Sequence, residues 1–547
     1  MTFDRLLNPE PENWLQVHGT YNHWRYSLLE EITPENVGSL RLAFAAALGP
    51  AVAGGRGSEG IPVVDDGFLY IANSQSVVFK FNVQSGINAL PLWSFDTGLS
   101  FIAPGPVLTV ANRGLALSGD AVFVNNTDGL VVAIDRQSGE AVWEQQLGIP
   151  AAEGMTGQPF AVKDVVLIGN SRGDWGTRGW VAALDAVTGD ERWRFYTIPG
   201  PGEAGHETWL NDAWETGGGG VWTQPSYDPD TNLVFVGVGN AAPAFDPAYR
   251  PGDNLYTTST VALDADTGAL AWYHQFVANE GFEWDEVSPN LIIDTEVAGE
   301  SRQVLAHHST RNGYFYVLDR LTGEHILAAP NAPSVDWTAG FDPKTGLPVE
   351  YDPDADIQSY DGINATRDGS SRPICTAGVH WGGNAYNPDL NRVYSVVMDS
   401  CSTRATAAPD YDEIPYVFGN VVDGRTQGYR LRSVPGAPVP DDMLRTLVGP
   451  HLTAVDVSTG ETVAAVPVLG ASPIGGTFGT ATGLIFVGYN DGGFRAYDAD
   501  TLQQLWEMNL GTPIRGPAMS YAVDGKQYIA VTGSGNNETA MLWVFAL

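Results

Sequence analysis

One short pattern recurs along the chain and limits what it can fold into. An apolar segment ends in Asp or Asn, two or three residues follow, then Thr or Ser with Gly, and often a Trp in the next segment. The Asp carboxylate can cap a tight turn and the Gly can take the positive φ that the turn needs, so each copy predicts a β-hairpin. The copies are centred on Asn82, Asp135, Asp185, Asp264, Asp319, Asp456 and Asp498.

The spacing of these copies predicts a repeat architecture. Where no insertion intervenes, it matches one four-stranded blade of a β-propeller. A blade has apolar faces that only its neighbours can cover, so the blades must close into a ring. The strand-like segments 38–44, 527–531 and 541–545 have no hairpin of their own and can form an eighth blade from the two chain ends. We therefore expect one all-β domain over residues 1–547, an eight-bladed β-propeller.

Two insertions interrupt the spacing between Asp319 and Asp456. They are the segments 330–371 and 403–440, and the first is rich in Asp and Pro. Long loops on a rigid scaffold are usually functional or disordered. We expect both insertions to lie over one end of the ring and to shape an entrance.

Composition excludes some functions. The chain has 64 Asp and Glu against 28 Lys and Arg, a net charge of −36, which argues against nucleic-acid binding and is compatible with a basic partner or a bound cation. No apolar run is long enough for a membrane span. Cys375 and Cys401 are either free thiols or one disulfide, and a disulfide would indicate an oxidising compartment. The start at Met1 shows no signal peptide, and we expect that any leader has been removed.

Two local clusters favour a bound planar ligand or cation. The glycines 217–220 are followed by Trp222, which suits stacking on a flat molecule, although a glycine loop with a core Trp fits as well. Asp174 lies in a glycine turn within segment 171–179, and Asn240 ends an apolar strand. Oxygen donors of these kinds bind hard cations such as calcium, while the alternative for Asp174 is a capped turn.

Two further clusters carry charge. The sequence Glu283-Trp284-Asp285-Glu286 either binds a cation or faces water, and a carboxylate beside a metal ion can act as a general base. Arg311 opens a strand and can donate paired hydrogen bonds to carboxylate or quinone oxygens. A surface arginine is the alternative.

In order and spacing these clusters resemble the pyrroloquinoline-quinone (PQQ) dependent alcohol dehydrogenases of the methanol and ethanol dehydrogenase type. The resemblance runs nearly end to end, from segments 14–19 and 24–27 through 111–115 to the C-terminal strands. Its most specific parts are the Gly-Gly-Gly-Gly-Val-Trp run at 217–222, Gly239-Asn240, and Glu-Trp-Asp at 283–285.

The resemblance implies a role for each cluster. Trp222 would be the floor on which the quinone stacks, and Asp174, Asn240 and Asp285 would bind calcium. Asp285 would also be the general base, and Arg311 would bind the quinone oxygens. The other positions that match cofactor contacts are Glu59, Arg113, Thr156, Ser171, Gly173, His380 and Trp381. His380 could contact the quinone or the substrate, or be a packed histidine.

The resemblance also implies that Cys375 and Cys401 form a disulfide, which favours a periplasmic or secreted protein.

Three departures from the family pattern matter. Asp174 replaces the usual Glu, and Val107-Leu108-Thr109 replaces the usual pair of adjacent cysteines over the cofactor. Val287 stands where the lanthanide-using branch has an extra Asp, so calcium is favoured. No Cys-x-x-Cys-His motif is present, so we expect electrons to go to a separate acceptor such as cytochrome c.

The sequence thus predicts a PQQ- and calcium-dependent enzyme that oxidises an alcohol to an aldehyde or ketone. The alternative is a non-catalytic propeller, a scaffold or binding protein of an envelope complex, and a degenerate enzyme is a third possibility. The substrate stays open, because the insertions could admit a bulky secondary alcohol, a polyol or a polymer, or could narrow the mouth to small primary alcohols.

Overall fold

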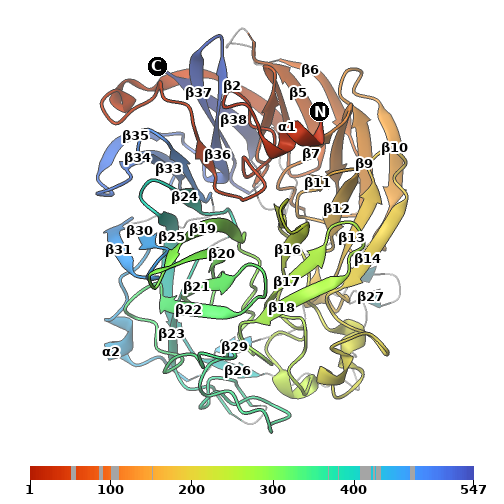
Figure 1. Cartoon of the computed structure of the whole chain (residues 1–547), viewed down its shortest axis with the longest axis vertical. Helices are drawn as coiled ribbons and strands as arrows, with labels where there is room; N and C mark the ends of the chain where they lie inside the picture. The colour runs from red at the N-terminus through yellow and green to blue at the C-terminus, as the bar shows by residue number, and fades with distance from the viewer. Residues whose placement is uncertain are drawn as a thin grey trace.

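The computed structural model describes residues 1–50, 57–84, 90–99, 110–150, 152–366, 369–379, 381–406, 421–422, 425–426, 433–435, 437–468, 475–536 and 538–547. Eight sheets, each built on four antiparallel strands, stand around a common centre (Figure 1). The prediction of an eight-bladed β-propeller is therefore confirmed.

The first four blades follow the chain without interruption. Blade 1 contains β3 (Val63–Asp65), β4 (Phe68–Ala72), β5 (Val77–Asn82) and β6 (Pro91–Asp96). Blade 2 contains β7 (Ala116–Ser118), β8 (Ala121–Asn125), β9 (Leu130–Asp135) and β10 (Ala141–Gln146). Blade 3 contains β11 (Phe160–Val162), β12 (Val165–Gly169), β13 (Trp180–Asp185) and β14 (Glu191–Tyr196). Blade 4 contains β15 (Ser226–Asp228), β16 (Leu233–Gly237), β17 (Ser259–Asp264) and β18 (Leu270–Gln275).

The second half is less regular. Blade 5 contains β19 (Leu291–Val297), β20 (Glu300–His308), β21 (Tyr314–Asp319) and β22 (His325–Pro330). Blade 6 contains β24 (Ala385–Asn387), β25 (Arg392–Ser402), β30 (His451–Asp456) and β31 (Thr462–Pro467), with β23 (Ile374–Gly378) added to β25. Blade 7 contains β32 (Thr477–Thr480), β33 (Leu484–Gly488), β34 (Gly493–Asp498) and β35 (Gln504–Asn509), with β1 (Tyr26–Ser27) beside β32. Blade 8 contains β36 (Ile514–Val523), β37 (Lys526–Gly533), β38 (Thr539–Ala546) and β2 (Arg41–Pro50).

The remaining elements are short. They are the helices α1 (Phe3–Leu7) and α2 (Asp441–Leu444), the 3-10 turns η1 (Val37–Ser39), η2 (Gly173–Trp175), η3 (His206–Thr208), η4 (Asp212–Thr216) and η5 (Pro247–Tyr249), and the strand pairs β26 (Arg404–Thr406) with β29 (Ser433–Pro435) and β27 (Val421–Val422) with β28 (Arg425–Thr426). In the part of the chain that the structure describes, no helix has the length and apolar character that a membrane span requires.

A tryptophan joins each of the early blades to the next. Trp193 on β14 packs on the turn of blade 4, where a side chain on Gly268 would come within 2.4 Å of the indole. The indole Nε1 donates to the carbonyl of Ala265 at 3.1 Å. In the same turn, Asp264 accepts hydrogen bonds from the backbone and the hydroxyl of Thr267. The Asp and Gly of the repeat thus shape the turn and also make room for the neighbouring Trp. The equivalent contacts are Trp93 on Gly139, Trp143 on Gly189 and Trp272 on Gly323.

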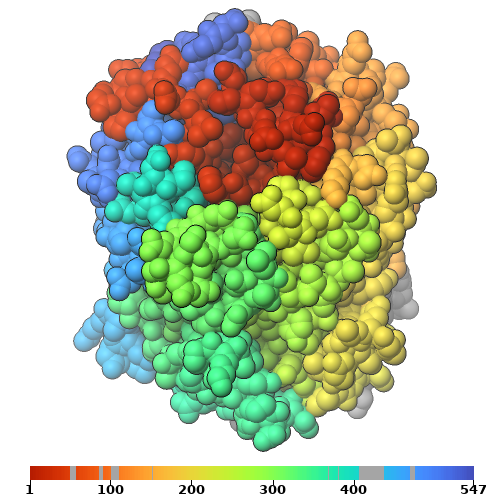
Figure 2. Space-filling view, viewed as in Figure 1, coloured from red at the N-terminus to blue at the C-terminus, as the bar shows by residue number. Residues whose placement is uncertain are grey.

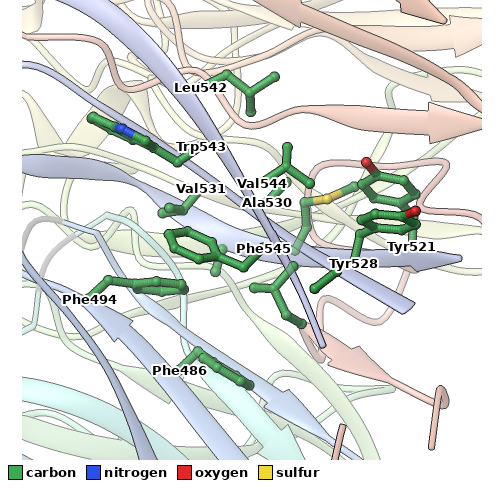
Figure 3. Close-up of a cluster of buried hydrophobic side chains, with 14 of the residues drawn as sticks. Phe486, Phe494, Tyr521, Tyr528, Ala530, Val531, Leu542, Trp543, Val544 and Phe545 are labelled. Carbon is green, nitrogen blue, oxygen red and sulfur yellow. The ribbon is translucent and has the colours of Figure 1, made fainter. Parts of the chain in front are cut away.

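The two ends of the chain meet in blade 8 and close the ring. β2 pairs antiparallel with β38, so that Ala45 lies opposite Trp543, and becomes the outermost strand of blade 8. Inside, Phe545 packs on Phe494 of blade 7 at 5.4 Å between ring centroids (Figure 3). This aromatic packing ties the C-terminal blade to its neighbour, and the pairing with β2 covers the edge of β38.

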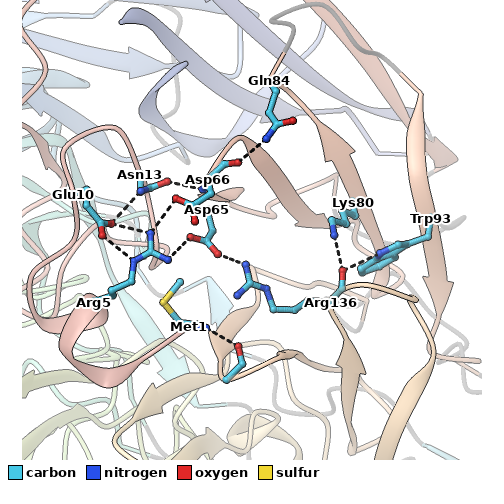
Figure 4. Close-up of polar contacts among 11 residues, drawn as sticks. Met1, Arg5, Glu10, Asn13, Asp65, Asp66, Lys80, Gln84, Trp93 and Arg136 are labelled. Atoms are coloured by element: carbon cyan, nitrogen blue, oxygen red, sulfur yellow. Dashed lines mark hydrogen bonds and ion pairs between the residues drawn. The ribbon is translucent and has the colours of Figure 1, made fainter. Parts of the chain in front are cut away.

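The N-terminal segment covers one end of the ring. Figure 2 shows it spread over the face in view, between the C-terminal blade and the blades from the middle of the chain. Arg5 pairs with Asp65 at 2.9 Å, and Arg136 binds the same carboxylate from blade 2 (Figure 4). Further along, the guanidinium of the fully buried Arg25 donates to the carbonyls of Thr477 and Ala518, among others.

This arrangement leaves the other end for a functional site. In an antiparallel blade the turns between the first and second strands lie at the same end as those between the third and fourth. Asp65, which anchors the N-terminal segment, ends the first strand of blade 1, and so marks that end. The loops between the second and third strands, and those between blades, lie at the opposite end.

The described part of the 330–371 insertion packs against loops at this opposite end. The indole of Trp337 donates to the carbonyl of Asn312 at 2.6 Å, and the hydroxyl of Tyr360 donates to that of Ala278 at 2.6 Å. In the 403–440 insertion, β26 pairs with β29, and much of the rest lies outside the described residues. The Cys375–Cys401 disulfide is present and joins β23 to β25, so the prediction of a disulfide is confirmed.

The Trp–Gly contact between blades generates a stability prediction. Gly268→Ala places a methyl group against Trp193 and keeps a positive φ of 70°. We expect the free energy of unfolding to fall by about 1–3 kcal/mol more than in Gly483→Ala, as typical for overpacking. Gly483 has a φ of 86° but open space around it, so it controls for backbone strain alone. Urea unfolding followed by tryptophan fluorescence measures both, and equal losses would show that the clash is relieved without cost.

Candidate active site

The backbone of the glycine run Gly217–Gly220 forms hydrogen bonds to loops of two neighbouring blades at the open end of the ring. Gly218 donates to the carbonyl of Thr177 at 3.0 Å, and Gly219 donates to that of Asn240 at 2.9 Å. A side chain on Gly218 would come within 2.7 Å of backbone atoms of Asn240 and Ala242, so the close approach requires glycine there. The run positions Trp222, whose partly exposed indole faces a cavity.

Asp285 lies at the edge of this indole. Its Oδ1 accepts a hydrogen bond from Trp222 Nε1 at 3.3 Å and one from the backbone of Asn240 at 3.1 Å. A side chain on Gly239 would come within 2.7 Å of the same oxygen. Gly239 is therefore the residue that lets the Asp285 carboxylate approach the Asn240 backbone, which explains the Gly-Asn pair noted in the sequence.

Asn240 connects the two acidic residues of the cavity. Its amide nitrogen donates to Asp174 Oδ1 at 2.9 Å and to the carbonyl of Ala241 at 2.9 Å. The nitrogen is thus engaged twice, which leaves the amide oxygen as the atom that can bind a cation. Asp174 itself is held in η2, between Arg172 and Gly176, which both have positive φ.

The cavity concentrates negative charge. Burial raises the pKa of Asp174 to about 8, and the charges of Glu283 and Asp285 add to this effect. Burial also raises the pKa of Asp285, while the charge of Arg311 opposes the rise. Carboxylates crowded in this way repel one another, and a bound cation would relieve this repulsion.

Arg311 reaches the same cavity from the loop between β20 and β21. Its guanidinium binds Glu283 at 2.9 Å and lies 3.9 Å from Asp285. The neighbouring Glu286 points away into blade 5, where it contacts His307 at 2.9 Å and accepts from Ser309 at 2.8 Å. The acidic cluster predicted from the sequence is therefore split, and only Glu283 and Asp285 line the cavity.

The residues matched to cofactor contacts meet on another side of the cavity. Arg113 pairs with the buried Glu59 at 3.0 Å and donates to the Thr156 hydroxyl at 2.8 Å. Its guanidinium carbon lies 4.9 Å from the ring centroid of Trp222 and 4.6 Å from that of Trp381. A cation held between two indoles is positioned to receive an anionic group of a ligand stacked on Trp222.

Most of the expected site residues are brought together. The cavity is lined by Trp222, Asn240, Asp174, Asp285, Arg311, Arg113, Thr156, Ser171 and Gly173, and Glu59 and Trp381 contact Arg113. Ser171 donates to the carbonyl of Gly154 at 2.8 Å. His380 and the expected apolar cover Val107-Leu108-Thr109 lie outside the described residues.

The donor set fits a hard cation that also has a cofactor ligand. Asp174, Asp285 and the Asn240 amide supply oxygen atoms, the donors that calcium prefers. Within the described residues, no group of three or more acidic, His or Cys side chains is placed to hold a metal ion. A cation here would therefore need further oxygen donors from a bound molecule. A planar quinone with carboxylates, stacked on Trp222 beside Arg113, has the required chemistry.

One residue that supports the site, Glu280, was not predicted from the sequence. Glu280 is buried, and its carboxylate accepts from the backbones of Phe282 at 2.7 Å and Trp284 at 3.2 Å. It therefore shapes the loop that carries Asp285. Burial raises the pKa of Glu280 to about 7, while the charge of Arg250 opposes the rise. No spacing in the sequence marks this role, because it depends on how the loop folds back on itself.

The chain is similar to known proteins over most of its length. The family model "PQQ: Glucose/ethanol/alcohol dehydrogenase, beta-propeller domain" matches residues 14–334 and 364–529. Quinohemoprotein alcohol dehydrogenase ADH-IIG of Pseudomonas putida is 34% identical over 95% of this chain and 72% of its own. The dehydrogenase subunit of alcohol dehydrogenase (quinone) from Komagataeibacter europaeus is 32% identical over 95% of this chain and 71% of its own.

Solved structures show the same likeness. The structure of quinohemoprotein alcohol dehydrogenase ADHIIG from Pseudomonas putida HK5 matches all of this chain and 82% of its own, with a TM-score of 0.84 and 30% identity. A europium-containing methanol dehydrogenase matches all of both chains, with a TM-score of 0.83 and 26% identity.

The buried Glu280 generates a pH prediction. Its pKa in the folded protein lies above its value in the unfolded chain, so the fold favours the protonated form. The stabilisation is present below about pH 4.5 and is lost as the pH rises through about 7. Glu280→Gln keeps the hydrogen-bond acceptor without titrating. When the pH is raised from 5 to 8, we expect the free energy of unfolding of this variant to increase relative to that of the wild type by up to about 3 kcal/mol.

The measurement is the urea midpoint at both pH values. The exposed Glu461→Gln is the matched control and should follow the wild type. A Glu280→Gln curve parallel to that of the wild type would contradict the assignment.

Proposed function

The chain belongs to the family of PQQ-dependent alcohol dehydrogenases, and we propose that it works with PQQ and a calcium ion, oxidises an alcohol to an aldehyde or ketone, and passes the electrons to an acceptor such as cytochrome c. One observation carries the proposal: Trp222, Asn240, Asp174, Asp285 and Arg311, which are spread over blades 3 to 5 and the loops between them, line one cavity. A non-catalytic scaffold has no use for this set of charges gathered around one partly exposed indole.

Asp285 is the proposed general base. Both of its hydrogen bonds, from Trp222 and from the Asn240 backbone, end on Oδ1. Oδ2 is therefore the oxygen left to take the proton from the hydroxyl group of a bound alcohol. The Arg311 guanidinium lies on the Oδ2 side at 3.9 Å and favours the ionised form that a base requires. A PQQ bound in this cavity would supply the hydride acceptor, and a calcium ion held beside it would supply a Lewis acid.

In this proposal, the other residues of the cavity bind and orient the cofactor and the cation. The Trp222 indole offers the stacking surface, and its own hydrogen bond to Asp285 fixes the distance between that surface and the base. Arg113, held by Glu59 and Thr156, binds the anionic edge of the cofactor. Asp174, Asn240 and Asp285 bind the cation, and Val287 adds no further carboxylate, which supports calcium over a trivalent ion. Arg311, tethered by Glu283, places positive charge where negative charge develops.

The disulfide supports a periplasmic or secreted location for this enzyme. Cys375 and Cys401 are directly opposite each other on β23 and β25, and such bonds persist in oxidising compartments.

The test is reconstitution followed by one substitution. Protein loaded with PQQ and calcium should reduce an artificial dye when given an alcohol, and a chelator added before loading should abolish the reaction. Asp285→Asn should retain PQQ but lose about a hundredfold or more of kcat, because the amide cannot take a proton.

Bound PQQ is measured by its absorbance after gel filtration, and kcat by dye reduction. Asp354→Asn, at an exposed position of the 330–371 insertion, is the control and should match the wild type. Full activity of Asp285→Asn would contradict the assignment of the base. Alcohol oxidation with NAD instead of PQQ would contradict the proposed function.

The proposed acceptor generates a salt dependence. A net charge of −36 attracts a basic cytochrome c over distances that salt screens. We expect the second-order rate of cytochrome c reduction to fall roughly tenfold or more between low and physiological ionic strength. An uncharged quinone dye is the control and should show no such fall. A rate that does not change with salt would argue against electrostatic docking.

A further inference from the structure

A second cavity of about 320 Å³ adjoins the candidate active site. The two cavities share Trp222 and Arg311, so the second one opens beside the proposed base and stacking surface. It lies between the loop that carries Phe282 and Trp284 on one side and the disulfide-linked strands β23 and β25 on the other. A substrate whose hydroxyl group reaches Asp285 would place the rest of its chain here.

One wall of this cavity is a strip of hydroxyl groups. Side chains alternate between the two faces of a strand, so Met398, Ser400 and Ser402 of β25 share one face, and all three line the cavity. On β23, Thr376 lies directly opposite Ser400 in the strand register. We call Thr376, Ser400 and Ser402 the hydroxyl strip.

These hydroxyls are available to a ligand. Among the residues that the structure describes, the side chains of the hydroxyl strip have no hydrogen bond to another part of the protein, and all three are at least partly exposed. Cys375 precedes Thr376 and Cys401 follows Ser400, so the disulfide joins β23 to β25 directly beside the strip. The donors and acceptors of the strip are thus placed by a covalent link, which lowers the entropy cost of using them in binding.

The opposite wall is aromatic. Phe282 and Trp284 stack with their ring centroids 5.2 Å apart, and both line the cavity. Beyond Ser402 on the same side as the strip, the Arg404 guanidinium lies 6.0 Å from the ring centroid of Phe282. A chain with C–H groups on one side and oxygen atoms on the other matches a slot with one aromatic and one hydroxyl wall.

We propose that the hydroxyl strip makes this enzyme prefer alcohols that carry further oxygen atoms along the chain, that is diols, polyols and ether alcohols, over alkanols of the same size. The inference rests on the proposed function, because it assigns the part of the substrate that Asp285 does not touch. A site built to hydrogen-bond an oxygen atom discriminates against an analogue that lacks it, since its own polar groups then lose water without a replacement.

The test uses three primary alcohols with seven heavy atoms each: 1-hexanol, 1,5-pentanediol and diethylene glycol. They differ only in whether a methyl or methylene group is replaced by oxygen. For the enzyme loaded with PQQ and calcium, we expect kcat/KM to be about three- to tenfold higher for 1,5-pentanediol than for 1-hexanol, and higher again for diethylene glycol, with the gain mainly in KM.

Variants locate the preference on the strip. Thr376→Val replaces a hydroxyl group by a methyl group of the same shape, and Ser400→Ala removes another hydroxyl. Each should lower the ratio of kcat/KM for diethylene glycol to that for 1-hexanol about three- to tenfold, and the double variant should lower it further. Ser301→Ala, at an exposed position of β20 in another blade, should leave the ratio unchanged.

Each outcome is decisive. If the wild type oxidises 1-hexanol readily and its kcat/KM for diethylene glycol is no higher than that for 1-hexanol, the inference is overturned and the proposed function stands. A ratio that the strip variants do not change would also overturn it. Oxidation of none of the three alcohols would overturn both the inference and the proposed function.

Binding can be followed without turnover. In saturation-transfer NMR with the protein not loaded with PQQ, diethylene glycol should receive magnetisation from the wild type and less from the Thr376→Val and Ser400→Ala double variant. Equal transfer to both proteins would place the ligand elsewhere and count against the strip.

Discussion

The pairing of β2 with β38 is the contact on which the rest of the structure depends. A blade buries its two faces only against its neighbours, so the ring has either eight covered interfaces or an exposed one. The strand from the N-terminus completes the blade made by the C-terminus. The site is built across neighbouring blades of this ring, because the Arg113 guanidinium, between blades 1 and 2, packs on Trp222, which precedes blade 4.

Within that frame, the open end of the ring holds charges that the fold alone would not favour. Asp174, Glu283 and Asp285 share one cavity, and burial raises the pKa of both aspartates. Glu283 has a positive φ, as does Arg172 beside Asp174. Such conformations persist only where surrounding contacts enforce them, and they gather at functional sites. The rigid ring tolerates this local strain because its stability resides in the blade interfaces.

Features that repeat along the chain could be predicted from the sequence, whereas features that depend on contacts between distant residues could not. The Asp and Gly of each turn act locally, so the blades and the closure of the ring could be predicted. Leu502 stands where the other turns have Gly and still adopts a φ of 57°. The residues of the proposed site were predicted through motifs that resemble a known family. Glu286 was grouped with the acidic cluster, but it points into blade 5, which adjacency in sequence cannot reveal.

The substrate side of the site was least predictable, and the reason is physical. Its walls come from the loop at Phe282, from β23 and from the end of β25, segments that are far apart in the chain. No blade repeat governs them, because the loop at Phe282 joins blades 4 and 5, β23 is added to blade 6, and β25 runs on beyond its pairing with β30. The cofactor side is built from loops tied directly to the blades, and so is fixed by the ring. On the proposed function, substrate preference can therefore vary through residues such as Ser400 and Ser402 without disturbing the proposed base, cation donors or stacking surface. The disulfide between β23 and β25 serves this division, because it stabilises the wall that the ring itself does not hold.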